Sequence, residues 1–227
     1  MARTLDPVAH AGRRDEFLDA AQALIQTSGY EQMTIQDILD RAEASRGAFY
    51  HYFDSKAALL EALVERLVSQ AMAAVTPIVA NAGLTATEKF TRLFASIGRW
   101  KTERRELMLA LLRVWYSDDN AVVREKQRQL TLTYLAPPVA GIIEQGRAEG
   151  VFTASPASDT ARVVLTLLYG ASETAGQLFF ARQARTVTFE TVEAQLGAYA
   201  VAVERVLGVT EGSLPIVDDE TLHAWFE

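Results

Sequence analysis

Apolar residues recur at a spacing of three and four along almost the whole chain, and this spacing limits the possible fold more than any other feature of the sequence. No segment sustains the strict alternation of apolar and polar residues that is typical of a strand with one buried face. A stripe of this kind buries one side of a helix, and we therefore predict an all-α protein. Residues 13–27 illustrate the pattern with Phe17, Ala20, Ala21, Leu24 and Ile25.

Capping residues divide this pattern into about nine helices. Thr34 and Asp37 have the spacing of a capping box, and Ser45 precedes another short helical segment with a hydroxyl that can accept from its first turn. Pro137 and Pro138 must kink or break the longest helix, because proline lacks the amide hydrogen that an interior position donates. The predicted helices cover residues 13–27, 35–41, 46–52, 56 to a stop between 77 and 83, 86–101, 103–116, 120–148, 157–183 and 188–208.

The composition excludes several classes of site. The 227 residues contain no cysteine, so disulfides, thiolate metal sites and cysteine nucleophiles are ruled out. The three histidines, His10, His51 and His223, lie far apart in the sequence and never at the spacing of a helical metal pair. The sequence also contains no glycine-rich loop of the kind that cradles phosphates. We therefore expect no enzyme active site, no metal and no cofactor.

The chain carries no segment typical of a secretory signal or of a good membrane span. Its longest uncharged stretch, residues 67–87, is interrupted by polar residues, Pro77 and Gly83. We therefore expect a cytoplasmic protein with no membrane partner. The acidic tail beyond residue 212 is expected to be loosely held, although it contains three residues that could dock elsewhere on the chain, Leu222, Trp225 and Phe226.

Three of the predicted helices precede residue 54, and the second and third are short and joined by a tight turn. This order is typical of a helix-turn-helix, in which the second helix of the pair enters the major groove of DNA. The net charge is −7, and residues 1–56, with six basic and nine acidic residues, carry −3. Affinity for DNA must therefore come from a local basic patch. The predicted domains are residues 1–56, which bind DNA, and residues 57–227.

The sequence of this segment is more specific than its order of helices. The stretch from Thr34 to Ala57, TIQDILDRAEASRGAFYHYFDSKA, resembles the DNA-binding signature of the TetR family of bacterial regulators. The resemblance extends over about residues 13–65, and beyond them it concerns helix number, helix length and the ending of the seventh helix. The family usually has Gly-Val in the turn, where this chain has Glu43-Ala44. Glu43 must therefore adopt a conformation that glycine takes without strain, or the turn must differ.

The residues of this signature suit contacts with DNA. Arg46 can donate two hydrogen bonds to a guanine, and the small residues Gly47 and Ala48 let the helix approach base edges. The other candidates offer hydroxyl, imidazole or ammonium donors for phosphates. The competing interpretation is a helical hairpin whose aromatic residues all lie in the core and whose Arg46 is merely solvated. The predicted DNA contacts are Thr34, Ser45, Arg46, Gly47, Ala48, Tyr50, His51 and Lys56.

The helix predicted at residues 157–183 is apolar on two opposite sides. A helix that is apolar all round must be buried all round, and a small all-α domain offers a single core. We therefore expect its second side to form, with the helix at 188–208, the interface of a homodimer, as the resemblance also implies. The alternative is a helix at the centre of one subunit.

A pocket for a small organic effector is implied by the resemblance. Glu173 is the one charged residue between Val163 and Ala181, and a buried carboxylate needs a partner. It could face a ligand, Arg162, Arg182 or the partner chain. The predicted effector-binding residues, each of which suits an ordinary core as well, are Trp100, Met108, Leu112, Trp115, Tyr134, Tyr169 and Glu173.

These features predict a homodimeric TetR-like transcriptional regulator, a repressor that binds a palindromic operator in double-stranded DNA and is released by a small organic effector. Release requires an effector that binds two conformations with different affinity. Two alternatives stay open. One is a DNA-binding regulator controlled by a protein partner or by no ligand. The other is a helical small-molecule-binding protein or enzyme with a vestigial DNA-binding head.

Overall fold

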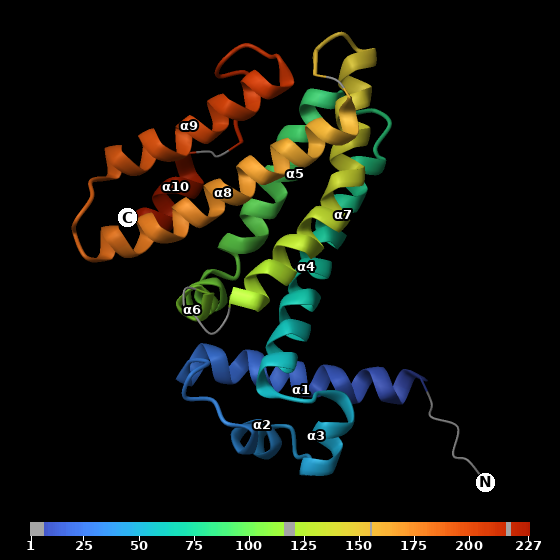
Figure 1. Ribbon diagram of the computed structural model, residues 1–227, viewed down its shortest axis with the longest axis vertical. Coiled ribbons are helices and arrows are strands. Elements are labelled where there is room, and N and C mark those ends of the chain that lie inside the picture. Colours follow the sequence, from blue (N-terminus) through green and yellow to red (C-terminus); the bar gives the residue numbers. More distant parts are fainter. Residues whose placement is uncertain (1–6, 116–120, 155, 217–218) are drawn as a thin grey trace. The chain divides into compact units, whose positions relative to one another are not determined.

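The computed structural model describes residues 7–115, 121–154, 156–216 and 219–227, and every regular element in them is an α-helix, as predicted (Figure 1). The helices are α1 (Pro7–Ser28), α2 (Ile35–Arg41), α3 (Arg46–Tyr52), α4 (Lys56–Ala80), α5 (Ala86–Thr102), α6 (Arg105–Trp115), α7 (Ala121–Ala148), α8 (Ala157–Gln183), α9 (Phe189–Leu207) and α10 (Asp219–Phe226).

Most predicted helix boundaries lie within two residues of the observed ones. The main difference at the N-terminal side is α1, which begins at Pro7 and not at residue 13. Proline is favourable as a first helical residue, because its φ is already helical and its missing amide hydrogen would have no partner there. α4 likewise continues past Pro77 for one more turn, to Ala80.

Of the two outcomes predicted for the longest helix, a kink or a break, the break does not occur. α7 continues through Pro137 and Pro138 to Ala148. Residues on both sides of the prolines are buried, among them Leu135, Val139 and Ile142. Packing of this apolar face therefore holds the helix together where two of its backbone hydrogen bonds are missing.

The chain ends in a tenth helix, where a loosely held tail was expected. In α10 the side chain of Leu222 is buried in a cluster with Leu178, Val192 and Leu196. The indole Nε1 of Trp225 donates a hydrogen bond of 2.9 Å to Thr102 Oγ1. α10 thus packs against α8 and α5, and the expectation of a loose tail is wrong for the part of it that the structure describes. The docking suggested for Leu222, Trp225 and Phe226 is confirmed.

The chain forms two compact units. The first unit comprises Met1–Val68 and Arg104–Gln127, and the second comprises Ser69–Glu103 and Arg128–Glu227. α4 and α7 each contribute residues to both units, and α6 belongs to the first, where it packs against α1. These are units of packing. A functional boundary at residue 56 remains a prediction.

An aromatic cluster forms the centre of the first unit. Phe17 of α1 is fully buried and lies edge-on to Phe49 at 5.6 Å and to Phe53 at 6.2 Å between ring centroids. Leu59 and Leu63 of α4 are also fully buried. The residues that hold α3 against α1 and α4 are therefore apolar and interior, as the helix-turn-helix interpretation requires.

The second unit has a larger core between α4, α5, α7, α8 and α9. At the end of α7 the ring of Phe152 packs so closely on Gly146 that a Cβ at this position would lie 2.2 Å from it.

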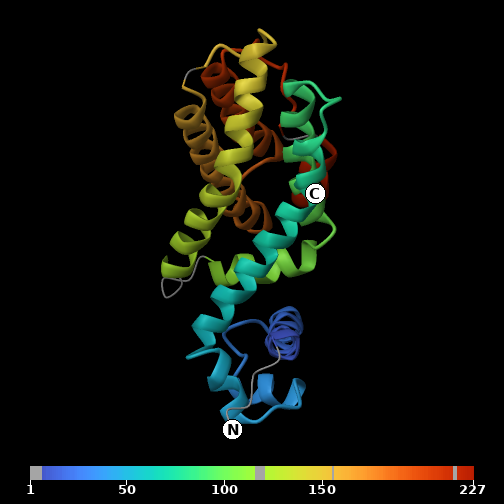
Figure 2. The ribbon, with the colours of Figure 1, turned by 90° about the vertical axis from the view of Figure 1, so that its right-hand side faces the viewer.

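Glu204 is 2% exposed, and its two carboxylate oxygens accept backbone hydrogen bonds from Gly212 and Leu214 at 2.9 and 2.8 Å. This buried carboxylate holds the loop after α9. α8 and α9 lie side by side in both ribbon views (Figures 1 and 2).

α4 is long and apolar enough to cross a membrane by length and composition. Several of its apolar residues are buried inside the protein. Leu59 and Leu63 are fully buried in the first unit and Val75 is buried in the second. Arg66 pairs with Asp19 of α1 at 2.7 Å. These contacts favour a core helix of the folded chain over a membrane span.

Candidate nucleic-acid interface and ligand pocket

The N-terminus of α2 carries the predicted capping box. Thr34 Oγ1 accepts from the amide of Asp37 at 3.1 Å, and the Asp37 carboxylate accepts from the Thr34 amide at 2.8 Å. The Thr34 hydroxyl also donates to this carboxylate at 2.7 Å. These hydrogen bonds hold the pKa of Asp37 below its usual value. Thr34 is exposed, but its one hydroxyl hydrogen is engaged in the cap, which competes with the predicted donation to a phosphate.

The turn between α2 and α3 has the backbone conformation predicted for it. Glu43 has φ +46°, in the left-handed region that glycine adopts without strain. The amide of Ala44 donates to Leu39 O at 2.9 Å, and Arg13 Nη2 of α1 donates to Glu43 O at 3.1 Å. Two contacts from outside the turn thus hold a conformation that a glutamate takes at a cost.

α3 presents one face to the core and the other to solvent. Ser45 caps it by accepting from the amide of Ala48 at 3.2 Å, as predicted. Phe49 is fully buried. Most of the other predicted contacts of this helix lie at the surface, with Ala48 partly buried and the following four exposed: Arg46, Gly47, Tyr50 and His51. The solvent face of α3 therefore collects a guanidinium, a phenol, an imidazole and a residue without a side chain.

Lys56 occupies a different position from the one expected of a phosphate contact. Its ammonium donates to Tyr30 O and Met33 O, each at 3.1 Å, and lies 4.4 Å from the centroid of the Tyr30 ring. The side chain is partly buried. Two of its three hydrogens thus tie the start of α4 to the turn before α2. Contact with a phosphate through the third remains a prediction.

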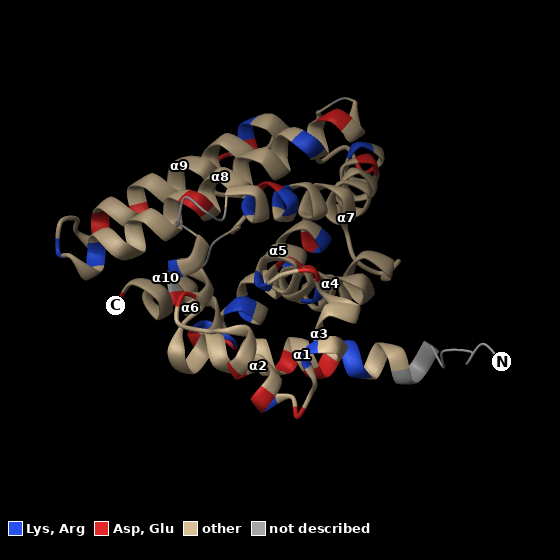
Figure 3. Cartoon of the chain, turned by 60° about the horizontal axis from the view of Figure 1, so that its bottom comes forward, with Lys and Arg blue, Asp and Glu red and all other residues tan. Residues whose placement is uncertain are grey.

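The fold brings together two histidines that are 41 positions apart in the sequence. The rings of His10 on α1 and His51 on α3 lie 5.5 Å apart, and that of His10 lies 4.6 Å from Tyr52. His10 was not among the predicted contacts, because only tertiary packing places it beside α3. Figure 3 shows basic and acidic residues along the same helix α1, so the charge of this surface is mixed.

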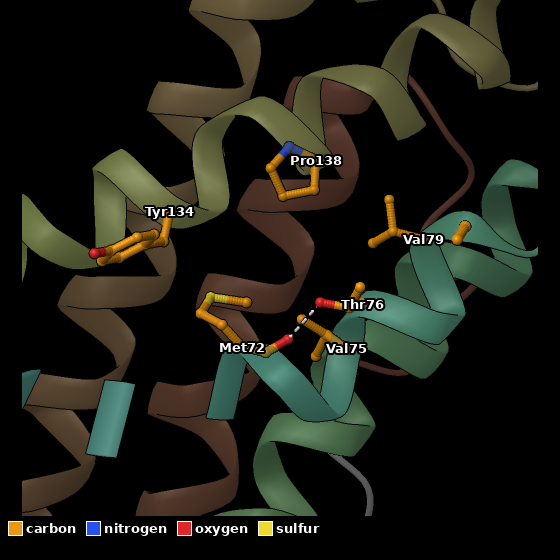
Figure 4. A pocket seen from close by; sticks show the side chains of 7 residues that line it. Met72, Val75, Thr76, Val79, Tyr134 and Pro138 are labelled. Atoms are coloured by element: carbon orange, nitrogen blue, oxygen red, sulfur yellow. Dashed lines mark hydrogen bonds between the residues drawn. The ribbon is translucent and has the colours of Figure 1, made fainter. Parts of the chain in front are cut away.

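A pocket of about 390 Å³ lies in the second unit between α4 and α7. Figure 4 shows Met72, Val75, Thr76 and Val79 on one side and Tyr134 and Pro138 on the other, and Ala80 completes the lining. The Thr76 hydroxyl donates to Met72 O at 3.0 Å, while the phenol of Tyr134 is at the surface. None of these lining residues is charged. The pocket therefore suits a small apolar molecule that is neutral.

The predicted effector residues are distributed over both units. Three of them, Met108, Leu112 and Trp115, lie on α6 in the first unit. In the second unit Tyr134 lines the pocket, whereas Trp100 is buried on α5, and Tyr169 and Glu173 are half-buried on α8. Arg182 donates to two backbone oxygens, those of Val187 and Phe226. Sequence reasoning missed the α4 side of this pocket, whose residues look like an ordinary core stripe.

The chain leaves part of α8 and α9 uncovered. Charged residues are sparse on the middle of α8 (Figure 3). Val163 is 49% exposed, although a valine on this apolar helix would be expected inside. The uncovered stripe of α8 begins at the exposed Val163 and continues at helical spacing through the partly buried Leu167, Gly170, Ala171 and Thr174. The corresponding residues of α9 are the exposed Ala194, Gly197 and Ala198 and the partly buried Val201.

The segment from α1 to the start of α4 has a close match among known proteins. The sequence model of "Bacterial regulatory proteins, tetR family" matches residues 17–63, which contain both caps, the turn and α3. Residues 17–63 thus match the DNA-binding segment of the TetR family. The predicted resemblance is thereby confirmed.

The proteins to which this chain is similar include two that are named as HTH-type transcriptional repressors. KstR of Mycobacterium tuberculosis is 30% identical over 117 residues, which are 52% of this chain and 53% of that protein. KstR2 of Rhodococcus jostii is 33% identical over 76 residues, which are 34% of this chain and 37% of that protein. The matched segments thus span between about a third and a half of these relatives.

Solved structures share the fold over nearly the full length. RolR, crystallised with resorcinol, has a TM-score of 0.63 at 17% identity, with 96% of this chain and 95% of that chain covered. A TetR transcription regulator from Haloarcula marismortui has a TM-score of 0.61 at 23% identity, with 87% and 97% covered. At these identities the likeness concerns the fold.

Proposed function

We propose that the chain is a DNA-binding transcriptional repressor whose α3 reads base edges in the major groove. The observation that carries the proposal is the exposed face of α3, where Arg46, Gly47, Tyr50 and His51 lie opposite a buried Phe49. This arrangement leaves a forked donor and two phosphate-binding groups in solvent while the cap and the turn fix the helix. The names of the relatives support repression.

The proposal is tested by measuring which base pairs the protein prefers. A binding site is first selected from a library of random duplexes, and its affinity for Arg46→Ala is compared with that of the wild type. Loss of a bidentate contact to guanine should cost roughly 1–3 kcal/mol and relax the preference at one position of each half-site. Arg92→Ala, at an exposed arginine of α5, is the matched control. Unchanged affinity and preference in Arg46→Ala would refute this role of α3.

We propose further that two chains form a dimer through the uncovered stripes of α8 and α9. Burial of these apolar and small residues supplies the interface that one chain leaves open. Two recognition helices about 34 Å apart would then match successive major grooves, and the operator would be palindromic.

Ala171→Glu tests the dimer, because it places a charge in the middle of the stripe. We expect monomers that keep their helical content and lose affinity for the selected duplex. Thr133→Glu, at an exposed position of α7, should leave the oligomeric state unchanged. Wild-type protein that sediments as a monomer at micromolar concentration would contradict the proposal.

The effector is proposed to be a small, neutral, largely apolar molecule held in the pocket between α4 and α7. Its lining offers Met72, Val75 and Val79 for apolar contact and the phenol of Tyr134 for one hydrogen bond. The resorcinol bound to the structurally similar RolR is a compound of this class. Because α4 continues from the pocket into the first unit, a ligand that prefers one position of α4 would shift the population that binds DNA.

Resorcinol and a quaternary ammonium of similar size are suitable probes for this pocket. The neutral phenol should release the selected duplex, and Tyr134→Phe should weaken that release by about tenfold, or about 1.4 kcal/mol, without changing affinity in its absence. Thr133→Ala is the neighbouring control. If the cation releases DNA instead, and Glu173→Gln abolishes its effect, the effector site involves Glu173 and not this pocket.

The remaining alternatives give different results in the same assays. A regulator controlled by a protein partner or by no ligand would bind the duplex and respond to neither probe. A small-molecule-binding protein with a vestigial head would bind probes and shift no duplex. A repressor of this kind acts on chromosomal DNA, and we propose the cytoplasm as its compartment.

A further inference from the structure

His10 and His51 place two imidazoles at one point on the surface of the first unit. Their ring centroids are 5.5 Å apart with the planes at 77°, and each ring also contacts that of Tyr52, at 4.6 and 5.0 Å. His51 is exposed and His10 is partly exposed. Within the described part of the chain neither imidazole makes a hydrogen bond, so their nitrogens can bind groups from outside.

We propose that His10 and His51 together bind the phosphate backbone beside the major groove, and that binding takes up a proton. The inference rests on the proposed function, because it is α3 in the groove that brings His51, and with it His10, to the flanking strand. An imidazolium donates from both nitrogens, and a phosphate oxygen accepts only. The protonated pair is therefore the form that matches the phosphate.

The spacing of the two rings links phosphate binding to protonation. Two imidazolium groups at this distance repel each other. A phosphate beside them offsets this repulsion and favours the charged forms. By thermodynamic linkage, affinity for DNA must then rise as the pH falls. Histidine side chains commonly change charge close to neutral pH, so the effect lies in an accessible range.

The other charged and titratable groups here come from every element packed around the pair. α1 supplies Arg13 and Arg14, whose guanidinium groups lie over the rings of two buried phenylalanines. α3 supplies Tyr52, the turn after it supplies the exposed Asp54, and α4 supplies Lys56, which is held by two carbonyls. Arg14 strengthens the attraction for phosphate, whereas the charge of Arg13 is partly offset by its ion pair with Glu16 of α1. Asp54 weakens the attraction without changing the sign of the pH dependence.

The test uses the full chain and a fluorescein-labelled duplex of mixed sequence, about 30 base pairs long, because phosphate contacts do not depend on sequence. Fluorescence anisotropy gives the dissociation constant at fixed ionic strength between about pH 8 and about pH 6. Wild-type affinity should rise by about tenfold over this range. His10→Gln keeps a hydrogen-bonding side chain but cannot be protonated, and it should reduce this rise to about threefold or less.

Two further variants separate phosphate binding from a structural role. His10→Arg carries a fixed charge and should bind at about pH 8 more tightly than the wild type does at that pH, with a smaller rise in affinity toward about pH 6. His223→Gln changes the histidine that stacks on Phe189 in the second unit and should retain the wild-type pH profile. Melting temperatures of all variants are measured at each pH.

The outcomes distinguish this inference from the proposed function. Wild-type binding that does not depend on pH, or a His10→Gln profile parallel to that of the wild type, would overturn the inference and leave DNA binding intact. A uniform loss of affinity accompanied by a lower melting temperature would mean that His10 is structural, which also overturns it. If the wild type binds neither this duplex nor a selected one, both proposals fail together.

Discussion

Replacement of Lys56 by methionine removes an ammonium that the structure holds against two backbone carbonyls, and keeps most of the length of the side chain. A hydrogen bond from a charged donor contributes roughly 1.5–3 kcal/mol, and a cation over an exposed aromatic ring about 0.5–1 kcal/mol. The lower values apply, because Lys56 is only partly buried. The hydrogen bond to the Tyr30 carbonyl counts for less than a full bond, because that carbonyl also accepts from the Met33 amide. We expect Lys56→Met to lower the free energy of unfolding of the first unit by about 2–3 kcal/mol.

Urea unfolding and thermal melting, followed by circular dichroism, measure this change. A loss of this size should lower the melting temperature by roughly 5–10 °C. Lys126→Met is the matched control in the same unit, since Lys126 is exposed and pairs with Glu61 at the surface. That variant should change the free energy of unfolding by less than about 0.5 kcal/mol.

A measurement of DNA binding tests whether Lys56 has this structural role. If Lys56 holds the turn before α2 and does not touch DNA, folded Lys56→Met should bind a selected duplex with the salt dependence of the wild type. If instead its stability is unchanged while the slope of log affinity against log salt falls by about one unit, Lys56 binds a phosphate. The carbonyl contacts would then contribute nothing to the stability of the first unit.

Two other changes test details of the packing and the capping. Gly146→Ala puts a Cβ against the ring of Phe152, and the required shift should cost about 1–3 kcal/mol of stability in thermal melting, while the additional change Phe152→Leu should restore part of it. Asp37→Asn removes the charge that the Thr34 cap stabilises. Because the pKa of Asp37 is lower in the folded state, its contribution is present at neutral pH and is lost as the pH falls, so wild type and variant should differ in melting temperature at neutral pH and converge below about pH 4.

Local signals in the sequence were sufficient to predict most of the helices. Thr34 and Ser45 cap the helices they were expected to cap, and the unusual backbone of Glu43 followed from a residue that replaces glycine in the family's turn. These features depend on a few residues that are neighbours in the sequence, so they form whatever the rest of the chain packs against them. α7 and α10 differ because distant contacts decide them: buried neighbours carry α7 through two prolines, and Leu222 finds its partners on α8 and α9.

The residues of the candidate sites also fall into those that local sequence predicts and those that only tertiary packing brings together. The exposed face of α3 was predictable, because Arg46 and Tyr50 are four residues apart and share one face of the helix, whereas the apolar Phe49 is buried. The carbonyl partners of Lys56 and the proximity of His10 to α3 were not, because both depend on how α1 and α4 pack around the turn. No pattern in the sequence distinguishes an aliphatic residue that lines a pocket from one that fills a core.

The first unit is built from two separate stretches of the chain, and this has a consequence for its modularity. Residues 1–68 alone lack α6, whose buried Leu107 and Leu111 belong to the part of the chain that packs against α1. A fragment that ends at Val68, within α4, would therefore expose an apolar face of α1 to water. A chimera that joins the first unit to the second unit of another protein must therefore include α6. Recombination that preserves folding has to exchange two separate gene segments at once, and a gene that keeps both units together avoids this requirement.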